Sequence, residues 1–234
     1  MAFKKSKTDK EKHILASAIS RIDVHLKKHI VMKNKFIPAL ALILSITLFA
    51  FYSNREPLAI GSDIPQEKLI RKDFSGKEFS LDKIKTKKGL LVIFSCNTCP
   101  YVKYYETRIK DIQDKCKSMG IGAVIINSNE AYRGEEDSPE AMKKYAEAQN
   151  YSAPYLMDEK STLADAFGAT RTPECFLFDA NGKLIYKGAI DDNVKDEKAV
   201  SQHYLKEAIT AVSNGKKPEV SETKSIGCSI KRAE

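Results

Sequence analysis

The sequence predicts an α/β fold with a central mixed β-sheet and helices on both of its faces. Two continuous apolar runs, residues 89–95 and 121–128, have the pattern of strands buried on both faces. A helical pattern lies between the two runs, so we expect two parallel neighbouring strands. The third observation is the stretch 175–190, whose Asn181-Gly182 pair is the strongest short-range signal for a β-hairpin. An antiparallel hairpin added to parallel strands makes the sheet mixed.

Further elements lie before and after the two buried strands. A Ser-Gly turn within residues 73–81 predicts a short hairpin ahead of the first one. After the second, Pro139 suits the first position of a helix that runs to about residue 149, with Asp137 or Ser138 as its cap. A short extended piece follows this helix, so the two together form a helix-strand insertion.

Two more helices are predicted between residues 161 and 213. Ser161 is expected to cap a short helix that ends at Gly168. A final helix is expected over about 200–213, because apolar side chains recur there at helical spacing.

Charge is distributed very unevenly along the chain. The formal net charge is +8 at pH 7, yet residues 1–35 carry ten Lys and Arg side chains against three acidic ones. The rest of the chain is therefore almost neutral. Because binding to nucleic-acid phosphates requires a surplus of Lys and Arg on one surface, we expect no nucleic-acid partner for the globular part.

An apolar segment of 17 residues without any charge, 36–52, follows the basic tail. Its length reaches the lower limit for a membrane-spanning helix, and the Lys and Arg excess before it predicts a cytoplasmic N-terminus. We predict a basic cytoplasmic tail (1–35), a transmembrane signal anchor in the cytoplasmic membrane (36–52), a linker (53–59) and a globular domain (60–234) in the periplasm or another extracytoplasmic space. A signal peptide that starts at Met32 and is cleaved is the alternative, and it would secrete the same domain to the periplasm.

Cys96 and Cys99 stand directly after the first buried strand and directly before a helical pattern. Unpaired backbone N–H groups at the start of a helix favour negative charge, so this position is expected to lower the pKa of the Cys96 thiol. A thiolate is the form that attacks a disulfide. We therefore predict that Cys96 attacks a substrate disulfide and that Cys99, one turn further along, resolves the mixed disulfide.

Other uses of this cysteine pair fit the sequence less well. A structural zinc site needs four ligands, usually from two close pairs, and the chain has one close pair. A disulfide that closes so short a loop removes little chain entropy, so a purely stabilising role is disfavoured. The pattern favours redox chemistry without a metal or another cofactor, because the dithiol itself carries the electrons.

Several stretches together resemble one family. They are "CNTCPYVKYYE", "APYLMDE", "TPECFLFDANGKLIYKGAIDDN" and the terminal "SIGCSIK". As a set they resemble the thioredoxin-like redoxin family, the alkyl hydroperoxide reductase/thiol-specific antioxidant group, in its branch with a CxxCPYV active site, over about residues 58–232. The resemblance implies a thioredoxin fold and thiol-based redox activity. It also implies a cis peptide bond between Thr172 and Pro173, which would hold a substrate chain beside the cysteines.

The sequence departs from related families at two points. Thioredoxin has a Trp before its CxxC motif and Gly-Pro within it, whereas here Ser95 precedes the pair and Asn-Thr separates it. Peroxiredoxins activate their thiol within a Pro-x-x-x-Thr-x-x-Cys pattern, and residues 89–99 offer no such Pro. This departure disfavours a thiol peroxidase that reduces hydroperoxides, which is one alternative function. A non-catalytic module that binds a partner or copper is the other.

The function predicted from the sequence is a membrane-tethered thiol–disulfide oxidoreductase that acts outside the cytoplasm. Its partners would be protein disulfides or dithiols, a second thiol protein as electron donor or acceptor, and the membrane itself. Cys228 lies in the tail that the family shares. It is either an auxiliary redox cysteine that relays to the pair or a residue with a packing role.

Overall fold

The structure is a computed structural model that describes residues 56–233. The described residues belong to one compact unit. The predictions for the basic tail and for the apolar segment 36–52 lie outside the described residues. Among the residues that the structure describes, no helix is long and apolar enough to cross a membrane.

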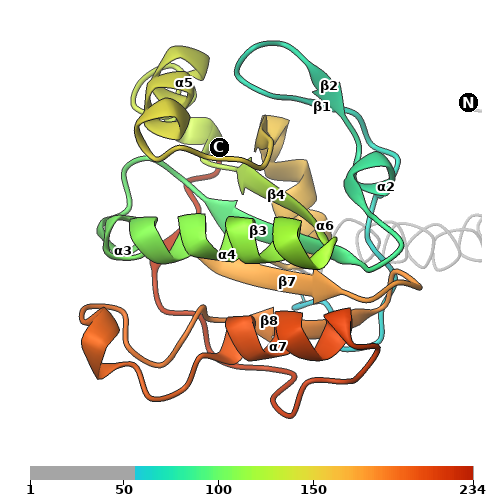
Figure 1. The fold of residues 1–234 in the computed structure, drawn as a ribbon. Coiled ribbons are helices and arrows are strands. Elements are labelled where there is room, and N and C mark those ends of the chain that lie inside the picture. Colours follow the sequence, from blue (N-terminus) through green and yellow to red (C-terminus); the bar gives the residue numbers. More distant parts are fainter. Residues whose placement is uncertain (1–55, 234) are drawn as a thin grey trace, which may run out of the picture. The chain divides into compact units, whose positions relative to one another are not determined.

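A five-stranded mixed sheet forms the centre of this unit, with the strand order β5-β4-β3-β7-β8 (Figure 1). The strands β3, β4 and β5 are parallel to one another, whereas β7 is antiparallel to both β3 and β8. The predicted mixed sheet, the parallel buried pair and the hairpin are thereby confirmed. The strands comprise β3 (Leu90–Ser95), β4 (Gly122–Asn127), β5 (Tyr155–Met157), β7 (Glu174–Phe178) and β8 (Leu184–Gly188).

Helices cover both faces of this sheet, as the sequence predicts. Successive residues of a strand point to opposite faces, so Leu91 and Ile93 of β3 enter one core cluster while Leu90, Val92 and Phe94 enter another. The first cluster includes residues of α4 (Glu106–Met119), α5 (Pro139–Ala148) and α7 (Tyr204–Ser213), and the second includes residues of α2 (Leu81–Ile84) and α6 (Thr162–Phe167).

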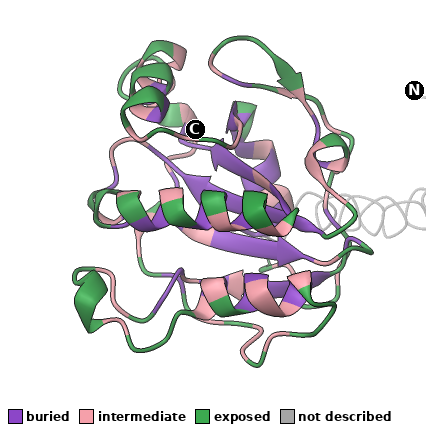
Figure 2. Cartoon of the chain, in the orientation of Figure 1, coloured by how far each residue is buried: buried purple, intermediate pink, exposed green. Residues whose placement is uncertain are grey.

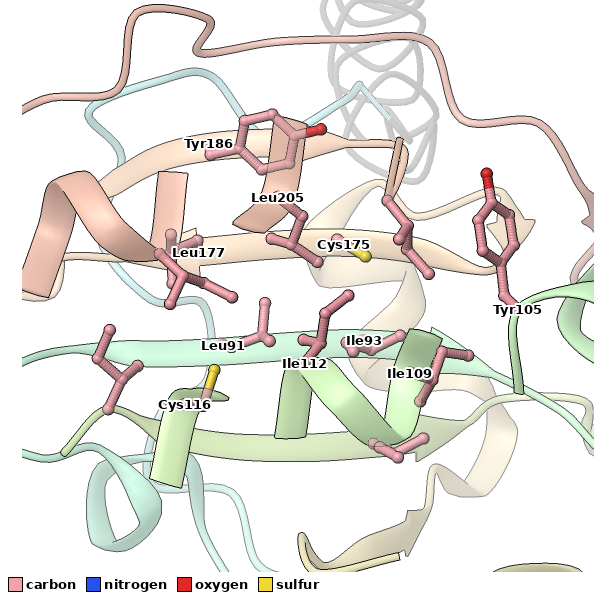
Figure 3. Packing of buried hydrophobic residues seen from close by; sticks show 14 of the residues in the cluster. Leu91, Ile93, Tyr105, Ile109, Ile112, Cys116, Cys175, Leu177, Tyr186 and Leu205 are labelled. Atoms are coloured by element: carbon pink, nitrogen blue, oxygen red, sulfur yellow. The ribbon is translucent and has the colours of Figure 1, made fainter. Parts of the chain in front are cut away.

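The first cluster fixes the helices that lie in front of the sheet. Figure 3 shows Ile109 and Ile112 of α4 and Leu205 of α7 in the layer against β3 and β7. Each fully buried Leu or Ile side chain contributes roughly 1.5–3 kcal/mol to folding. The strands are buried, whereas the outer face of α4 is exposed and that of α7 is mostly partly buried (Figure 2), as expected for a three-layer α/β domain.

The short hairpin near the N-terminal end of the described chain consists of β1 (Arg71–Lys72) and β2 (Glu78–Phe79), which pair in antiparallel orientation. It confirms the turn predicted within residues 73–81. Leu81, the last residue of that stretch, begins α2 instead.

Two helix starts differ from the predictions. Ser161 occupies the cap position of α6, but its hydroxyl donates to the Ser128 carbonyl at 2.7 Å. The carboxylate of Asp158 caps the helix instead and accepts the N–H groups of Leu163 and Ala164, both at 2.9 Å. The last helix, α7, begins at Tyr204 rather than near residue 200.

The helix of the insertion begins as predicted. Ser138 caps α5, because its hydroxyl accepts the N–H of Ala141 at 3.4 Å, and Pro139 is the first helical residue. The remaining short elements are η1 (Glu130–Tyr132), η2 (Glu159–Ser161), η3 (Glu197–Ala199), α3 (Pro100–Tyr104), β6 (Arg171–Thr172) and β9 (Cys228–Ser229).

Candidate active site

The CxxC loop connects the carboxyl end of β3 to α3. The helix begins at Pro100, so Cys99 is its N-cap and Cys96 lies three residues before it. This corrects the prediction that Cys99 lies one turn inside the helix. The physical reason is Pro100, because a proline pushes the preceding residue into extended conformations; Cys99 accordingly has φ −70° and ψ 121°.

Both thiols contact the same residue, Thr172. The Sγ atom of Cys96 lies 3.3 Å from the Thr172 hydroxyl, and the thiol of Cys99 donates to the Thr172 carbonyl at 3.1 Å. The peptide bond between Thr172 and Pro173 is cis, as the family resemblance implies. Cys96 and Cys99 are only 1% and 2% exposed. All four residues predicted for the site therefore meet at one place in the fold.

The two thiols affect each other's ionisation, so they titrate as a pair. A hydrogen bond donated by Cys96 would lower the pKa of Cys99 to about 4, against the effect of burial, and raise the pKa of Cys96. The neighbouring groups favour the opposite arrangement, with the proton on Cys99 and the negative charge on Cys96. The Thr172 carbonyl can only accept, which keeps a proton on Cys99. The hydroxyls of Thr172 and Thr98 can both donate to Cys96, at 3.3 and 4.0 Å. We therefore place the thiolate on Cys96.

A buried carboxylate that the sequence did not single out for the site fixes the loop between the cysteines. Asp137 is fully buried, and its Oδ1 atom accepts the backbone N–H of Asn97 at 2.9 Å and the side-chain amide of Asn127 at 2.7 Å. Its Oδ2 atom accepts the side-chain amide of Asn129 at 2.9 Å. The negative charge of Asp137 also raises the pKa of Cys96. The sequence indicated Asp137 only as a possible helix cap.

Asn97 is held on its other side as well. The hydroxyl of Tyr155 donates to its Oδ1 atom at 2.9 Å, and its side-chain amide donates to the Glu136 carbonyl at 2.8 Å. Tyr155 comes from β5 and Glu136 precedes α5, so both elements of the predicted helix-strand insertion position the CxxC loop.

A second buried network holds the start of α4. The guanidinium of Arg108 donates to both carboxylate oxygens of Asp191, at 2.9 and 2.7 Å, and the Tyr105 hydroxyl donates to the same carboxylate at 3.0 Å. Arg108 also lies over the Tyr105 ring, 4.0 Å from its centroid. This network connects α4, the second helix after the CxxC loop, to the chain after β8.

An open groove of about 630 Å³ lies beside the loop. It reaches Asn97 and Thr98, the two residues between the cysteines, and Lys103, Glu136 and Lys144 add charged groups to its wall. An incoming chain can therefore approach the loop along charged and polar surface.

Cys228 joins the site from the far end of the chain. The strand β9 pairs with β6 in antiparallel orientation, and this register places Cys228 opposite Thr172. The Cys228 side chain packs against the core cluster that contains Cys96 and Cys99. The structure therefore brings three cysteines together. The other two, Cys116 and Cys175, are fully buried in the core.

Two solved structures of undetermined function are similar to this chain. A hypothetical protein from Sinorhizobium meliloti 1021 matches with a TM-score of 0.70 and 32% identity, over 76% of this chain and 97% of that one. An uncharacterized conserved protein from Geobacillus kaustophilus has the same TM-score and identity, over 76% of this chain and 94% of its own. Both share the α/β architecture of this chain, and the fold is also that of a thioredoxin-like protein solved in its oxidized form, with a TM-score of 0.53 and 18% identity.

Sequence comparisons connect the same fold to redox proteins. The thiol-disulfide oxidoreductase ResA of Bacillus subtilis (strain 168) is 23% identical over 160 residues, which are 68% of this chain and 84% of that protein. The Redoxin family model matches residues 59–203, a range that contains the CxxC loop, Thr172 and Pro173. The chain belongs to the Redoxin family.

Proposed function

We propose that this protein is a thiol–disulfide oxidoreductase whose redox centre is the dithiol of Cys96 and Cys99. The observation that carries the proposal is the geometry of the pair: the Cys96 sulfur lies 3.3 Å from the Thr172 hydroxyl, and the Cys99 thiol donates to the Thr172 carbonyl at 3.1 Å, so both sulfurs converge on one residue. Thiols in contact can form a disulfide and release two electrons to a substrate. Membership of the Redoxin family and the similarity to ResA support the same chemistry.

The reaction follows from the groups around each sulfur. The Cys96 thiolate attacks one sulfur of a substrate disulfide, a new S–S bond forms, and the other substrate sulfur leaves with the electron pair and takes up a proton. Cys99 then gives up its proton and attacks Cys96 in the mixed disulfide. The second substrate sulfur leaves, and the disulfide between Cys96 and Cys99 remains. The reverse sequence oxidises a substrate dithiol.

Thr172 assists both halves of this reaction. Its hydroxyl stabilises the Cys96 thiolate, both as the attacking group and as the leaving group when the disulfide opens again. Its carbonyl accepts the thiol proton of Cys99 and so fixes the orientation of that thiol. We propose that Thr172 and Pro173 also border the place where a substrate chain lies.

We further propose that residues 36–52 anchor the protein in the cytoplasmic membrane and that the domain faces the extracytoplasmic space. The uncharged apolar segment and the Lys and Arg excess before it support this topology. Protease added outside intact cytoplasmic membranes should digest the domain and leave the basic tail. Complete protection of the domain would refute the topology.

Exchange with a protein disulfide tests the redox function. Full-length protein should catalyse the reduction of insulin disulfides by dithiothreitol. Cys96→Ser should abolish catalysis, because the attacking thiolate is gone. Cys99→Ser should accumulate a mixed disulfide with insulin at Cys96, because the resolving step is lost. Cys116→Ala, which removes a buried thiol from the last turns of α4, is the control and should behave as wild type.

Two outcomes would overturn the proposal. Full activity in Cys96→Ser would remove Cys96 from the reaction. Rapid consumption of hydroperoxide by a wild type that leaves insulin unchanged would establish a peroxidase instead.

A further inference from the structure

The C-terminal strap, defined as residues 221–232, lies across the site and is fastened at both ends. Near its start, Thr223 donates its backbone N–H to the Lys187 carbonyl of β8 at 3.0 Å. Near its end, the backbone N–H of Lys231 donates to the side chain of Asn129 at 2.9 Å, and Arg232 pairs with Asp165 at 2.7 Å. Figure 1 shows the strap in dark red, running from the β8 side to the chain end near α5.

The middle of the strap lies directly on β6. The Arg171 guanidinium donates to the Gly227 carbonyl at 3.0 Å, and Ile230 donates its N–H to the Thr170 carbonyl at 3.0 Å. A Cβ atom on Gly227 would lie 2.1 Å from the Thr172 carbonyl oxygen. A residue without a side chain is therefore required for the strap to approach the backbone that binds the Cys99 thiol.

This approach sets Cys228 beside Cys99. The register of β6 and β9 places Cys228 opposite Thr172, whose carbonyl accepts the Cys99 thiol at 3.1 Å. Cys99 consequently has one sulfur neighbour in Cys96 and another in Cys228. It is the central sulfur of the three and has a potential disulfide partner on each side.

We propose that Cys228 is a third redox cysteine that exchanges with Cys99 and carries disulfides between the buried pair and a second thiol protein. The proposal rests on the redox function proposed for Cys96 and Cys99. Its spatial basis is that Cys96 and Cys99 are almost completely covered, whereas Cys228 is partly exposed. The strap thus holds the Cys228 sulfur beside Thr172, the residue that both sulfurs of the pair contact.

The exchange balances without any further oxidant. The Cys228 sulfur attacks Cys99 in the disulfide between Cys96 and Cys99, the bond between Cys99 and Cys228 forms, and Cys96 leaves with the electron pair as a thiolate. Cys228 gives up its proton as it attacks, so the negative charge on Cys96 is balanced by the released proton. A thiol of the second protein then attacks Cys228 and releases Cys99. Its other thiol closes the disulfide of that protein and releases Cys228.

The hydrogen bonds of the site favour this order of events. Cys96 is a good leaving group, because the Thr172 and Thr98 hydroxyls stabilise its thiolate. In the reduced protein, burial and then the hydrogen bond to Cys99 raise the pKa of Cys228 to about 11. The second of these causes disappears once the sulfur of Cys99 is held in a disulfide, so Cys228 ionises more readily when the pair is oxidised.

Disulfide mapping in the full-length protein tests the exchange. Each variant is oxidised with oxidised glutathione, quenched with acid, alkylated and digested, and its linked peptides are identified by mass spectrometry. Cys96→Ser should contain a disulfide between Cys99 and Cys228 in most molecules, and Cys228→Ser should contain the disulfide between Cys96 and Cys99. Cys116→Ala is the control and should give the wild-type map.

A kinetic measurement supplies a second, independent readout. The oxidised protein is mixed with reduced thioredoxin as the second thiol protein, and the loss of the internal disulfide is followed. Cys228→Ser should slow this reaction about tenfold, because thioredoxin must then attack a covered sulfur.

The possible failures are distinguishable. In the first case, wild type and Cys228→Ser both form the disulfide between Cys96 and Cys99. If Cys228 nevertheless stays free to alkylate in Cys96→Ser, and Cys228→Ser reacts with thioredoxin at the wild-type rate, the relay is wrong and the redox pair stands. If no disulfide forms between Cys96 and Cys99 in either protein, the proposed function itself fails, and the relay fails with it.

Discussion

Gly227→Ala tests whether the C-terminal strap lies on the site as described. The added Cβ would lie 2.1 Å from the Thr172 carbonyl oxygen and 2.7 Å from its carbonyl carbon, where ordinary contacts begin at 3.4 Å. Both are backbone atoms of Thr172, which is buried, so the strap rather than β6 must move, by about 1 Å or more. Forcing an extra carbon into a packed site typically costs about 1–3 kcal/mol.

The strain should open the strap locally before it unfolds the rest of the domain. Local openings require less free energy than global unfolding, and each 1.4 kcal/mol changes an equilibrium about tenfold. The open population of the strap should therefore rise between about fivefold and about a hundredfold in Gly227→Ala. Cys228 is only partly exposed while the strap is closed, so its rate of alkylation should rise when the strap opens, by up to the same factor.

The assay is the alkylation rate of Cys228 in the reduced full-length protein, measured by mass spectrometry over time. Gly134→Ala is the matched control, because a Cβ at that position meets nothing within 4 Å. Its Cys228 should react at the wild-type rate. Equal rates in wild type, Gly134→Ala and Gly227→Ala would show that the strap does not rest on Thr172.

Two further predictions concern the pair itself. Asp137→Asn replaces one accepting oxygen by a donor, so at least one buried N–H loses its partner, and the free energy of unfolding in urea should fall by about 1–3 kcal/mol. The pKa of Cys96, which Asp137 raises, should fall in the same variant, and an unchanged thiol titration would contradict the role given to this carboxylate. The two thiols titrate as a pair, so the first of them to ionise has a pKa below the usual 9.0. Below pH 9 the unfolded chain then binds more protons than the folded one, so the stability of the reduced protein should increase as the pH rises toward 9, by at most about 1.4 kcal/mol per pH unit. This component should be lost as the pH falls and should be absent from a variant with both Cys96→Ala and Cys99→Ala; identical pH profiles would show that the pair holds no thiolate.

The redox pair of Cys96 and Cys99 could be predicted from the local sequence, but the groups that act on Cys96 could not. The CxxC spacing after a buried strand indicated a redox pair, and the pair lies at the carboxyl end of β3 as expected. The expected reason for an acidic Cys96, its place on the helix start, was wrong because α3 begins at Pro100. In the structure, the partners that can stabilise its thiolate are hydroxyl groups, of which that of Thr172 comes from a distant strand.

The sequence by itself determined the elements of this fold and the position of its reactive loop. Apolar runs, the Asn-Gly turn and proline positions act over a few residues, so β3, β4, the hairpin of β7 and β8 and the start of α5 could be predicted from the chain alone. The family resemblance added the cis bond between Thr172 and Pro173.

Only the tertiary structure decided which distant groups surround the two thiols. Asp137 became a buried acceptor for the CxxC loop rather than a helix cap, and Cys228 came to lie opposite Thr172 through the pairing of β6 with β9. Neither contact leaves a periodic signal in the sequence. Both depend on long-range packing and on hydrogen bonds between segments that meet only after the chain has folded, because a buried polar group takes whichever partner the fold presents to it.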